Sequence, residues 1–151
     1  MILVECKPDE ILARLMFNEE VFHGKCKSAI IIKLAKTPNL KGMVDEDPGK
    51  PVPTEFKQFK LVKNNDYLGL KIYSHNNNSV IYSLVPRLEE WILRISKLAK
   101  IDPLKFGLPN KSDMLRKMIN SKLDKFELLV RELERTKIWL EIERFVKSFS
   151  D

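Results

Sequence analysis

The stretch MILVECKPDEILARLM, residues 1–16, decides the fold. Residues 1–5 form a short apolar run that ends in an acid, which is typical of a strand buried on both faces. From Pro8 onward the apolar residues recur every three to five positions, which predicts a helix over residues 8–17. Proline suits the first turn of a helix, and the acid at Asp9 suits its positive end. A buried strand followed at once by an amphipathic helix indicates an α/β protein.

The segments that follow continue this alternation. Residues 21–23 are predicted to form a second strand, and the pattern of residues 25–36 fits either a strand or a helix. We favour the helix, because a further strand follows immediately at residues 41–44. The order strand, helix, strand, helix, strand is typical of a parallel sheet. The remaining predictions are a loop at 45–54, strands at 68–74 and 80–85, and helices at 87–100, 111–120 and 121–147, the last with a potential break near residues 135 and 136.

The bulk composition suits a soluble globular chain. Of the 151 residues, 44% are hydrophobic and 32% are charged, which is an ordinary profile. We expect an α/β domain over residues 1–110, and a C-terminal helical extension over residues 111–151 that packs on the same domain. No apolar run approaches the roughly 18–20 residues that span a bilayer, and no signal peptide opens the chain. We therefore expect a cytoplasmic protein without a membrane partner.

Cysteine, histidine and charge narrow the chemistry further. Cys6 and Cys26 match no zinc spacing and are too few for a disulfide framework, so we expect two reduced and buried thiols. The two histidines of the chain argue against a histidine-based metal site. The formal net charge of +6 permits an anionic partner such as nucleic acid.

Acids follow two of the predicted strands. Glu5 ends the first strand, and Asp45 and Asp47 follow the strand at residues 41–44. Ligands of open parallel sheets collect at the carboxyl ends of the strands, so two neighbouring strands would bring the three acids together. Asp45 and Asp47 project the same way while the backbone stays extended, which Pro48 favours at Asp47. The pattern therefore predicts one shared acidic pocket.

Such a pocket requires positive charge. Two carboxylates 4 Å apart cost about 4 kcal/mol at an effective dielectric near 20. A bound cation, proton uptake or nearby lysines would offset this repulsion, and Lys7, Lys25 and Lys50 lie close to the same loops in the sequence. Oxygen ligands select a hard ion such as Mg²⁺ or Mn²⁺. We therefore predict that the three acids bind this metal, and that the three lysines counter charge or contact nucleic-acid phosphate.

Several segments resemble those of the Toprim domain family. Glu5-Cys6-Lys7-Pro8-Asp9 is similar to the E-G-x-x-D opening of Toprim domains, with cysteine where the family has glycine, and Asp45-Glu46-Asp47 is similar to their D-x-D motif. Pro86-Arg87-Leu88-Glu89-Glu90-Trp91 resembles the L-E-D-[YW]-L segment of the OLD (overcoming lysogenization defect) nucleases. Phe106-Gly107-Leu108-Pro109 resembles a segment of small standalone relatives. Together these likenesses cover roughly residues 1–110.

The resemblance implies both a fold and an activity. It implies a Toprim-like (Rossmann-like), mostly parallel sheet flanked by helices, and Mg²⁺-dependent phosphoryl transfer on DNA or RNA, as in a nuclease-like hydrolase. In this family the motif acids bind Mg²⁺, and a helical acid supplements the site. That acid corresponds to Glu89 or, as a second choice, to Glu90. Glu5, Asp9 and Glu89 are then the candidate catalytic residues.

Two other functions stay open. The chain could be a non-catalytic module that keeps the Toprim fold and binds nucleic acid or a protein, or a small-molecule phosphate enzyme built on the same sheet. The apolar residues of the predicted helix at 121–147 recur at helical spacing. They would cover the chain's own sheet or form a face for a homodimer or a partner protein.

Overall fold

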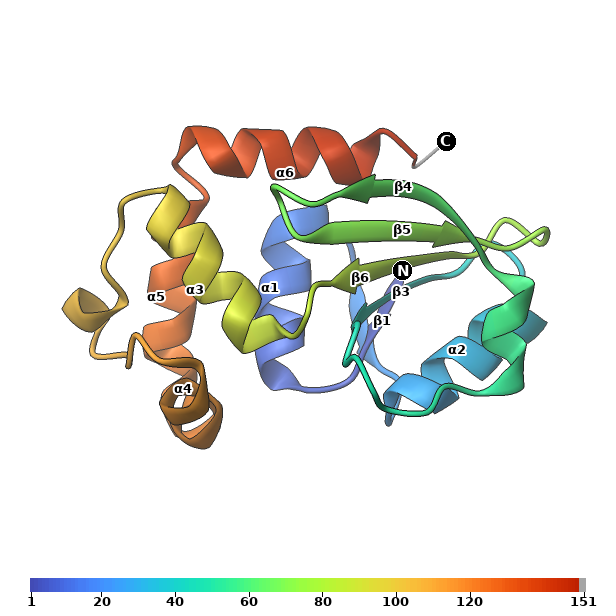
Figure 1. Cartoon of the computed structure of the whole chain (residues 1–151), viewed down its shortest axis with the longest axis horizontal. Helices are drawn as coiled ribbons and strands as arrows, with labels where there is room; N and C mark the ends of the chain where they lie inside the picture. Colours follow the sequence, from blue (N-terminus) through green and yellow to red (C-terminus); the bar gives the residue numbers. More distant parts are fainter. Residues whose placement is uncertain (150–151) are drawn as a thin grey trace.

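One mixed β-sheet forms the centre of the structure, a computed structural model that describes residues 1–149 (Figure 1). Its strands are β1 (Ile2–Val4), β2 (Val21–His23), β3 (Lys41–Asp45), β4 (Lys60–Asn65), β5 (Leu70–Ser74) and β6 (Val80–Leu84). They lie in the order β2-β1-β3-β6-β5-β4. The pairs β2–β1, β1–β3 and β3–β6 are parallel, whereas β6–β5 and β5–β4 are antiparallel. The predicted α/β class is confirmed, and the sheet is more mixed than the sequence suggested.

The strand β4 was not predicted, and it accounts for much of this difference. Every residue of β4 is exposed or half-buried, because β4 is the edge strand of the sheet. An edge strand without a buried face shows no alternation of apolar and polar residues. Its neighbour β5 begins at Leu70, two residues later than predicted, because the Asn65 side chain accepts a hydrogen bond from the Leu68 N–H (2.9 Å) and closes a turn.

Helices cover both faces of this sheet. They are α1 (Lys7–Phe17), α2 (Lys27–Lys36), α3 (Leu88–Leu98), α4 (Ser112–Met118), α5 (Leu123–Leu133) and α6 (Lys137–Lys147), with short 3₁₀ segments η1 (Thr54–Gln58), η2 (Pro103–Phe106) and η3 (Ile119–Ser121). The helix favoured for residues 25–36 is confirmed as α2. The break expected near residues 135 and 136 is also confirmed, since Thr136 is the extended residue that precedes α6. Within residues 1–149, none of these helices is long and apolar enough to cross a membrane.

The two faces of the sheet form separate hydrophobic clusters. In β1, Ile2 and Val4 belong to the cluster that contains residues of α1, α3, α5 and α6, whereas Leu3 belongs to the cluster that contains residues of α2. Phe126 of α5 and Ile142 of α6 are fully buried in the first cluster. The apolar stripe of the C-terminal helices therefore packs against the chain's own core. Figure 1 shows α3, α4 and α5 grouped beyond the end of β6.

Both cysteines are exposed, so the prediction of buried thiols is wrong. Cys6 precedes α1 and Cys26 precedes α2, each in extended backbone. The two residues thus lie where the chain leaves a parallel strand and turns into a helix. Solvent reaches such turns at the carboxyl ends of the strands, although the neighbouring sequence is apolar.

The parallel half of the sheet determines where the acids lie. Ile2 of β1 pairs with Lys41 of β3, and Asp45 at the end of β3 pairs with Leu84 at the end of β6. The carboxyl ends of these three strands consequently share one edge of the sheet. The turn that contains Glu5 and the start of α3 meet Asp45 there.

Candidate functional site

Asp45 is the last residue of β3, one residue beyond the predicted strand. Its Oδ1 accepts a hydrogen bond from the backbone N–H of Leu88 at 3.1 Å. Leu88 is the first residue of α3, so this carboxyl group also lies at the positive end of the helix dipole. The hydrogen bond holds the Asp45 side chain at the edge of the sheet.

Four other acids act on Asp45. Burial is the main reason that the pKa of Asp45 is raised to about 8. Repulsion from nearby carboxylates adds to this shift, in the order Asp9, Glu89, Asp47 and Glu5. They belong to α1, to α3, to the loop after β3 and to the turn after β1. Five of the acids that the sequence singled out are therefore close enough to interact electrostatically.

Asp9 is the most enclosed of these acids. Only 6% of its surface is exposed, and burial raises the pKa of Asp9 to about 6. The Cys6 Sγ donates a hydrogen bond to Oδ2 of Asp9 at 3.0 Å. Partial desolvation of the thiol, and then the charge of Asp9, raise the pKa of Cys6. The thiol therefore keeps its proton and remains a donor to the carboxyl group.

Asp47 differs from its prediction. Its φ is +51°, so the backbone is left-handed and not extended, despite the following Pro48. The N–H of Asp47 donates to the carbonyl of Pro86 at 2.9 Å, which ties this loop to the segment before α3. Its carboxylate pairs with Arg87 Nε at 2.7 Å and with Lys50 Nζ at 3.7 Å. Two cations thus already counter the charge of Asp47.

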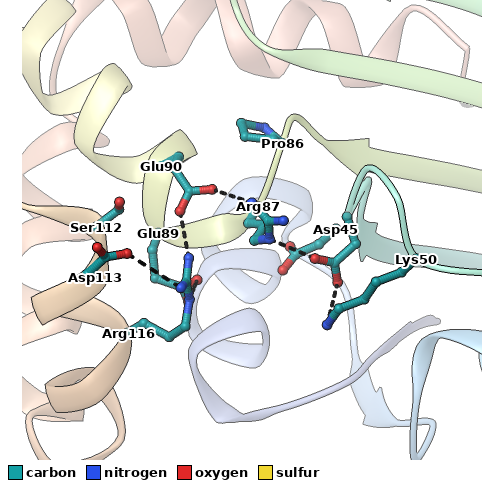
Figure 2. A pocket seen from close by; sticks show the side chains of 10 residues that line it. Asp45, Lys50, Pro86, Arg87, Glu89, Glu90, Ser112, Asp113 and Arg116 are labelled. Carbon is teal, nitrogen blue, oxygen red and sulfur yellow. Dashed lines mark hydrogen bonds and ion pairs between the residues drawn. The ribbon is translucent and has the colours of Figure 1, made fainter.

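A pocket of about 700 Å³ opens beside Asp45, and a chain of ion pairs runs along it (Figure 2). Arg87 also contacts Glu90 at 3.2 Å, and Arg116 of α4 contacts Glu90 at 2.8 Å and Glu89 at 3.5 Å. The pairs therefore link α3 to α4 across the pocket. The lining residues are Asp45, Asp47, Lys50, Pro86, Arg87, Glu89, Glu90, Ser112, Asp113 and Arg116.

The lysines that the sequence singled out lie at the rim of the site. Lys7 and Lys25 are exposed, and Lys25 has a φ of +72° in the turn between β2 and α2. The Lys50 side chain is 70% exposed beside Asp47. None of the three is enclosed among the acids.

One half-buried lysine near the acids was missed by sequence reasoning. Lys27, the first residue of α2, donates from Nζ to the carbonyl of Glu46 at 2.7 Å. Desolvation lowers the pKa of Lys27, while the charges of Asp47, Asp45 and Glu5 oppose the shift. Its only signal in the sequence was its place at the start of a helix that follows a parallel strand. Arg87 and Arg116 were likewise missed as partners of the acids.

The carboxyl groups around Asp45 are of the donor type that hard divalent cations prefer. Carboxylate oxygens are ligands that Mg²⁺ and Mn²⁺ accept, and repulsion from four nearby carboxylates adds to the burial that raises the pKa of Asp45. In residues 1–149, no group of three or more His, Cys, Asp or Glu side chains is arranged to hold a metal ion. Two of the candidate acids already have a cationic partner, because Asp47 is paired with Arg87 and Glu89 with Arg116. Within residues 1–149, Glu5, Asp9 and Asp45 form no ion pair.

Comparisons of the chain with family models, with curated proteins and with solved structures give no match.

Proposed function

We propose that this chain is a Toprim-like protein that uses Mg²⁺ or Mn²⁺ for phosphoryl transfer on nucleic acid, in the manner of a nuclease. The observation that carries the proposal is the group of acids around Asp45, whose pKa burial and then four carboxylates raise to about 8. A site of this kind is stabilised when a cation replaces the proton. The cation would come with the substrate phosphates, which Mg²⁺ commonly shares with one or two carboxylates.

The family part of the proposal is supported by the place of each motif in the fold. Glu5 follows β1, Asp45 ends β3, and Glu89 lies in the first turn of α3. Parallel strands carry these segments to one edge of the sheet, where open α/β sheets bind ligands. Cys6, which stands in the place of the motif glycine, adopts extended backbone with φ of −143°. This position therefore does not require glycine.

Glu5, Asp9, Asp45 and Glu89 are the residues that would hold the ion. When bound, the ion would supply polarisation of a phosphoryl oxygen and a water molecule of lowered pKa. Glu5 is the exposed member of the group, so it can take a proton from an attacking water that solvent delivers. Asp9 is enclosed and hydrogen-bonded to Cys6, which suits a role in positioning the other acids. Lys27, the first residue of α2, lowers the net negative charge around these acids.

Nucleic acid is the substrate class that the charge distribution favours. The chain carries a formal net charge of +6, although several of its acids lie together around Asp45. Cations outside that edge can attract a polyanion by its phosphates. The pocket beside Asp45 is lined by Arg87, Arg116 and Lys50 as well as by acids, so a phosphodiester would meet positive charge next to the candidate metal ligands.

A cleavage assay with matched variants tests this proposal. Purified protein is incubated at pH 8 with plasmid, single-stranded DNA or single-stranded RNA, in Mg²⁺, Mn²⁺ or EDTA. Asp45→Asn and Glu5→Gln remove one charge each without changing side-chain size. Asp124→Asn is the matched control, because Asp124 is exposed in α5. Cutting that needs metal, that both site variants lose at least about 100-fold, and that the control retains would support the proposal.

The same assay separates the two other functions. A module without activity would bind the polymers without cutting them, and EDTA would not change that binding. A small-molecule phosphate enzyme would turn over nucleotides but not the polymers. Either result would overturn the proposed nuclease-like activity.

A further inference from the structure

A second hollow, of about 420 Å³, lies beside the turn between β4 and β5. Segments that are far apart in the sequence form it, namely β4, the β4–β5 turn, α6 and the residue that follows α6. Its lining shares no residue with the pocket at Asp45. The lining residues are Lys63, Asn65, Tyr67, Leu68, Glu141, Arg144, Phe145 and Ser148.

Tyr67 presents an exposed aromatic ring on a turn that is held in place. The residue is 56% exposed, and within residues 1–149 no other aromatic ring stacks on it. The N–H of Leu68 donates to Asn65 Oδ1 at 2.9 Å, and the Trp91 indole donates to the carbonyl of Leu68 at 2.8 Å. Trp91 is fully buried, so the turn is anchored to the core. A ring held in this way loses little conformational entropy when it stacks on a ligand.

Two cations, Lys63 and Arg144, line this hollow. Lys63 donates to the hydroxyl of Ser148 at 2.7 Å, a contact that leaves its charge in place. Within residues 1–149, neither Lys63 nor Arg144 forms an ion pair with a carboxylate, and Glu141 is the one acid in the lining. This contrasts with the pocket at Asp45, where Arg87 and Arg116 are paired with acids. The cations of the hollow are therefore available to an external anion.

The hollow is connected to the proposed site through α3. The Trp91 that anchors the turn belongs to α3, and the first turn of the same helix carries Glu89. The N–H of Val85, just after β6, donates to the carbonyl of Gly69 in the turn at 3.0 Å. The β4–β5 turn thus lies at the same edge of the sheet as the candidate acids. A chain-like ligand could cross the N-terminal part of α3 from the hollow to the pocket at Asp45.

We propose that Tyr67, Lys63 and Arg144 bind a single-stranded nucleic acid, with one base stacked on Tyr67 and the neighbouring phosphates on the two cations. The proposed function is what identifies the ligand as a nucleic acid, and the inference rests on it to that extent. An aromatic ring beside cations is the recurring way in which proteins bind single strands, because every base has a face that can stack. In a duplex the bases are already stacked inside, so the site selects unpaired strands.

The test measures binding without catalysis. A labelled 12-nucleotide single strand of mixed sequence, as DNA and as RNA, is titrated with the full chain in EDTA and followed by fluorescence anisotropy. Tyr67→Ala is expected to raise the dissociation constant about tenfold to a hundredfold, whereas Tyr67→Phe keeps the stacking face and binds like the wild type. Phe22→Ala is the matched control, because Phe22 is another exposed aromatic residue, 45% exposed in β2 at the opposite edge of the sheet.

Salt dependence tests the two cations separately. Lys63→Gln and Arg144→Gln are each expected to lower the slope of log K against log salt concentration by about 0.7, the value for one lost contact to a single-strand phosphate. The DNA and RNA titrations show which sugar the site prefers. A duplex of the same length is expected to bind at least about tenfold more weakly than the single strand.

The outcomes distinguish this inference from the proposed function. Equal affinities of wild type and Tyr67→Ala, or no binding by the wild type, would overturn the inference even if metal-dependent cutting is observed. A loss of affinity confined to Tyr67→Ala and the two cation variants supports it. If these variants lose affinity but the wild type shows no metal-dependent cleavage, the result supports the binding site and contradicts the proposed phosphoryl transfer.

Discussion

The Nε of Arg87 lies 2.7 Å from Oδ1 of Asp47, and this ion pair counters the charge of one acid beside Asp45. The same guanidinium contacts Glu90 at 3.2 Å. One arginine therefore joins the loop after β3 to the first turn of α3. Asp47 and Glu90 thus have a cationic partner, whereas Glu5, Asp9 and Asp45 form no ion pair within residues 1–149.

Replacing Arg87 is expected to release Asp47 as a metal ligand. Arg87→Gln removes the charge that pairs with Asp47, so the affinity for Mn²⁺ should increase at least about twofold. Without metal, the thermal midpoint should fall, because Asp47 and Glu90 lose their shared partner. Mn²⁺ titration followed by electron paramagnetic resonance and thermal unfolding in EDTA measure the two effects.

A matched control for this change is Arg135→Gln. Arg135 pairs with Glu132 at 3.7 Å and its side chain is 78% exposed. Its loss should therefore change neither the Mn²⁺ affinity nor the thermal midpoint. Weaker Mn²⁺ binding by Arg87→Gln than by the wild type would show that Arg87 does not compete with the metal.

The stability of the protein should depend on pH through Asp45. The pKa of Asp45 is about 8 in the folded state, above the ordinary pKa of 3.8 for an aspartate. Between these two pH values the folded chain holds a proton that the unfolded chain has lost. The free energy of unfolding should therefore fall as the pH rises from about 4 to about 8, by at most about 1.4 kcal/mol per pH unit from this group. Asp9, with a pKa of about 6, adds to the slope at lower pH.

Asp45→Asn is the variant that isolates this effect. Its amide keeps an acceptor for the Leu88 N–H and cannot ionise, so the decline in stability toward pH 8 should become shallower. Urea unfolding at pH 5, 6.5 and 8 measures the slope for both proteins. Identical slopes would mean that Asp45 titrates normally in the folded chain.

Lys27 should oppose metal binding and assist the reaction. Lys27→Met removes a half-buried ammonium beside the acids, so Mn²⁺ should bind several-fold more tightly, while cleavage at saturating metal should fall about tenfold or more. Lys33→Met is the control on the exposed face of α2. Calorimetric Mn²⁺ titration and single-turnover cleavage give the two values, and parallel losses in both would contradict this account.

Gly69 should be the more demanding of two glycines with positive φ. A Cβ at Gly69 (φ +65°) would lie 3.0 Å from Trp91 Cδ1 and 3.2 Å from the Val85 carbonyl oxygen, whereas a Cβ at Gly49 (φ +86°) would have nothing within 4 Å. Gly49→Ala carries only the backbone strain of about 1 kcal/mol. Gly69→Ala should cost about 1–2 kcal/mol more, measured by urea unfolding. Equal costs would show that the β4–β5 turn is not packed as described.

Much of the fold was predictable because its buried half shows clear periodicity. The continuous apolar run of β1 and the helical spacing of α1 differ in period, and both elements lie within one or two residues of their predicted bounds. β4 shows no such pattern, since its residues face solvent at the edge of the sheet. Its pairing with β5 comes from a turn closed by Asn65 and not from hydrophobic periodicity.

The candidate site was predictable in position but not in detail. Acids at the ends of neighbouring parallel strands must share an edge, and this placed Asp45 near Glu5. The left-handed backbone of Asp47 depends on a hydrogen bond to Pro86 and on Arg87, which is distant in the sequence. No local pattern reports such a contact. The same holds for Lys27, which is one lysine among many until the topology brings it beside the acids.

The measurement that most directly tests the central claim is Mn²⁺ binding to the apo protein at pH 8, where Asp45 can lose its proton. Isothermal calorimetry of the wild type, Asp45→Asn and the control Asp124→Asn would be compared under identical conditions. We predict saturable binding by the wild type and the control, and binding at least about tenfold weaker by Asp45→Asn. Equal binding by all three proteins, or no binding by the wild type, would contradict the claim that the acids around Asp45 form a metal site.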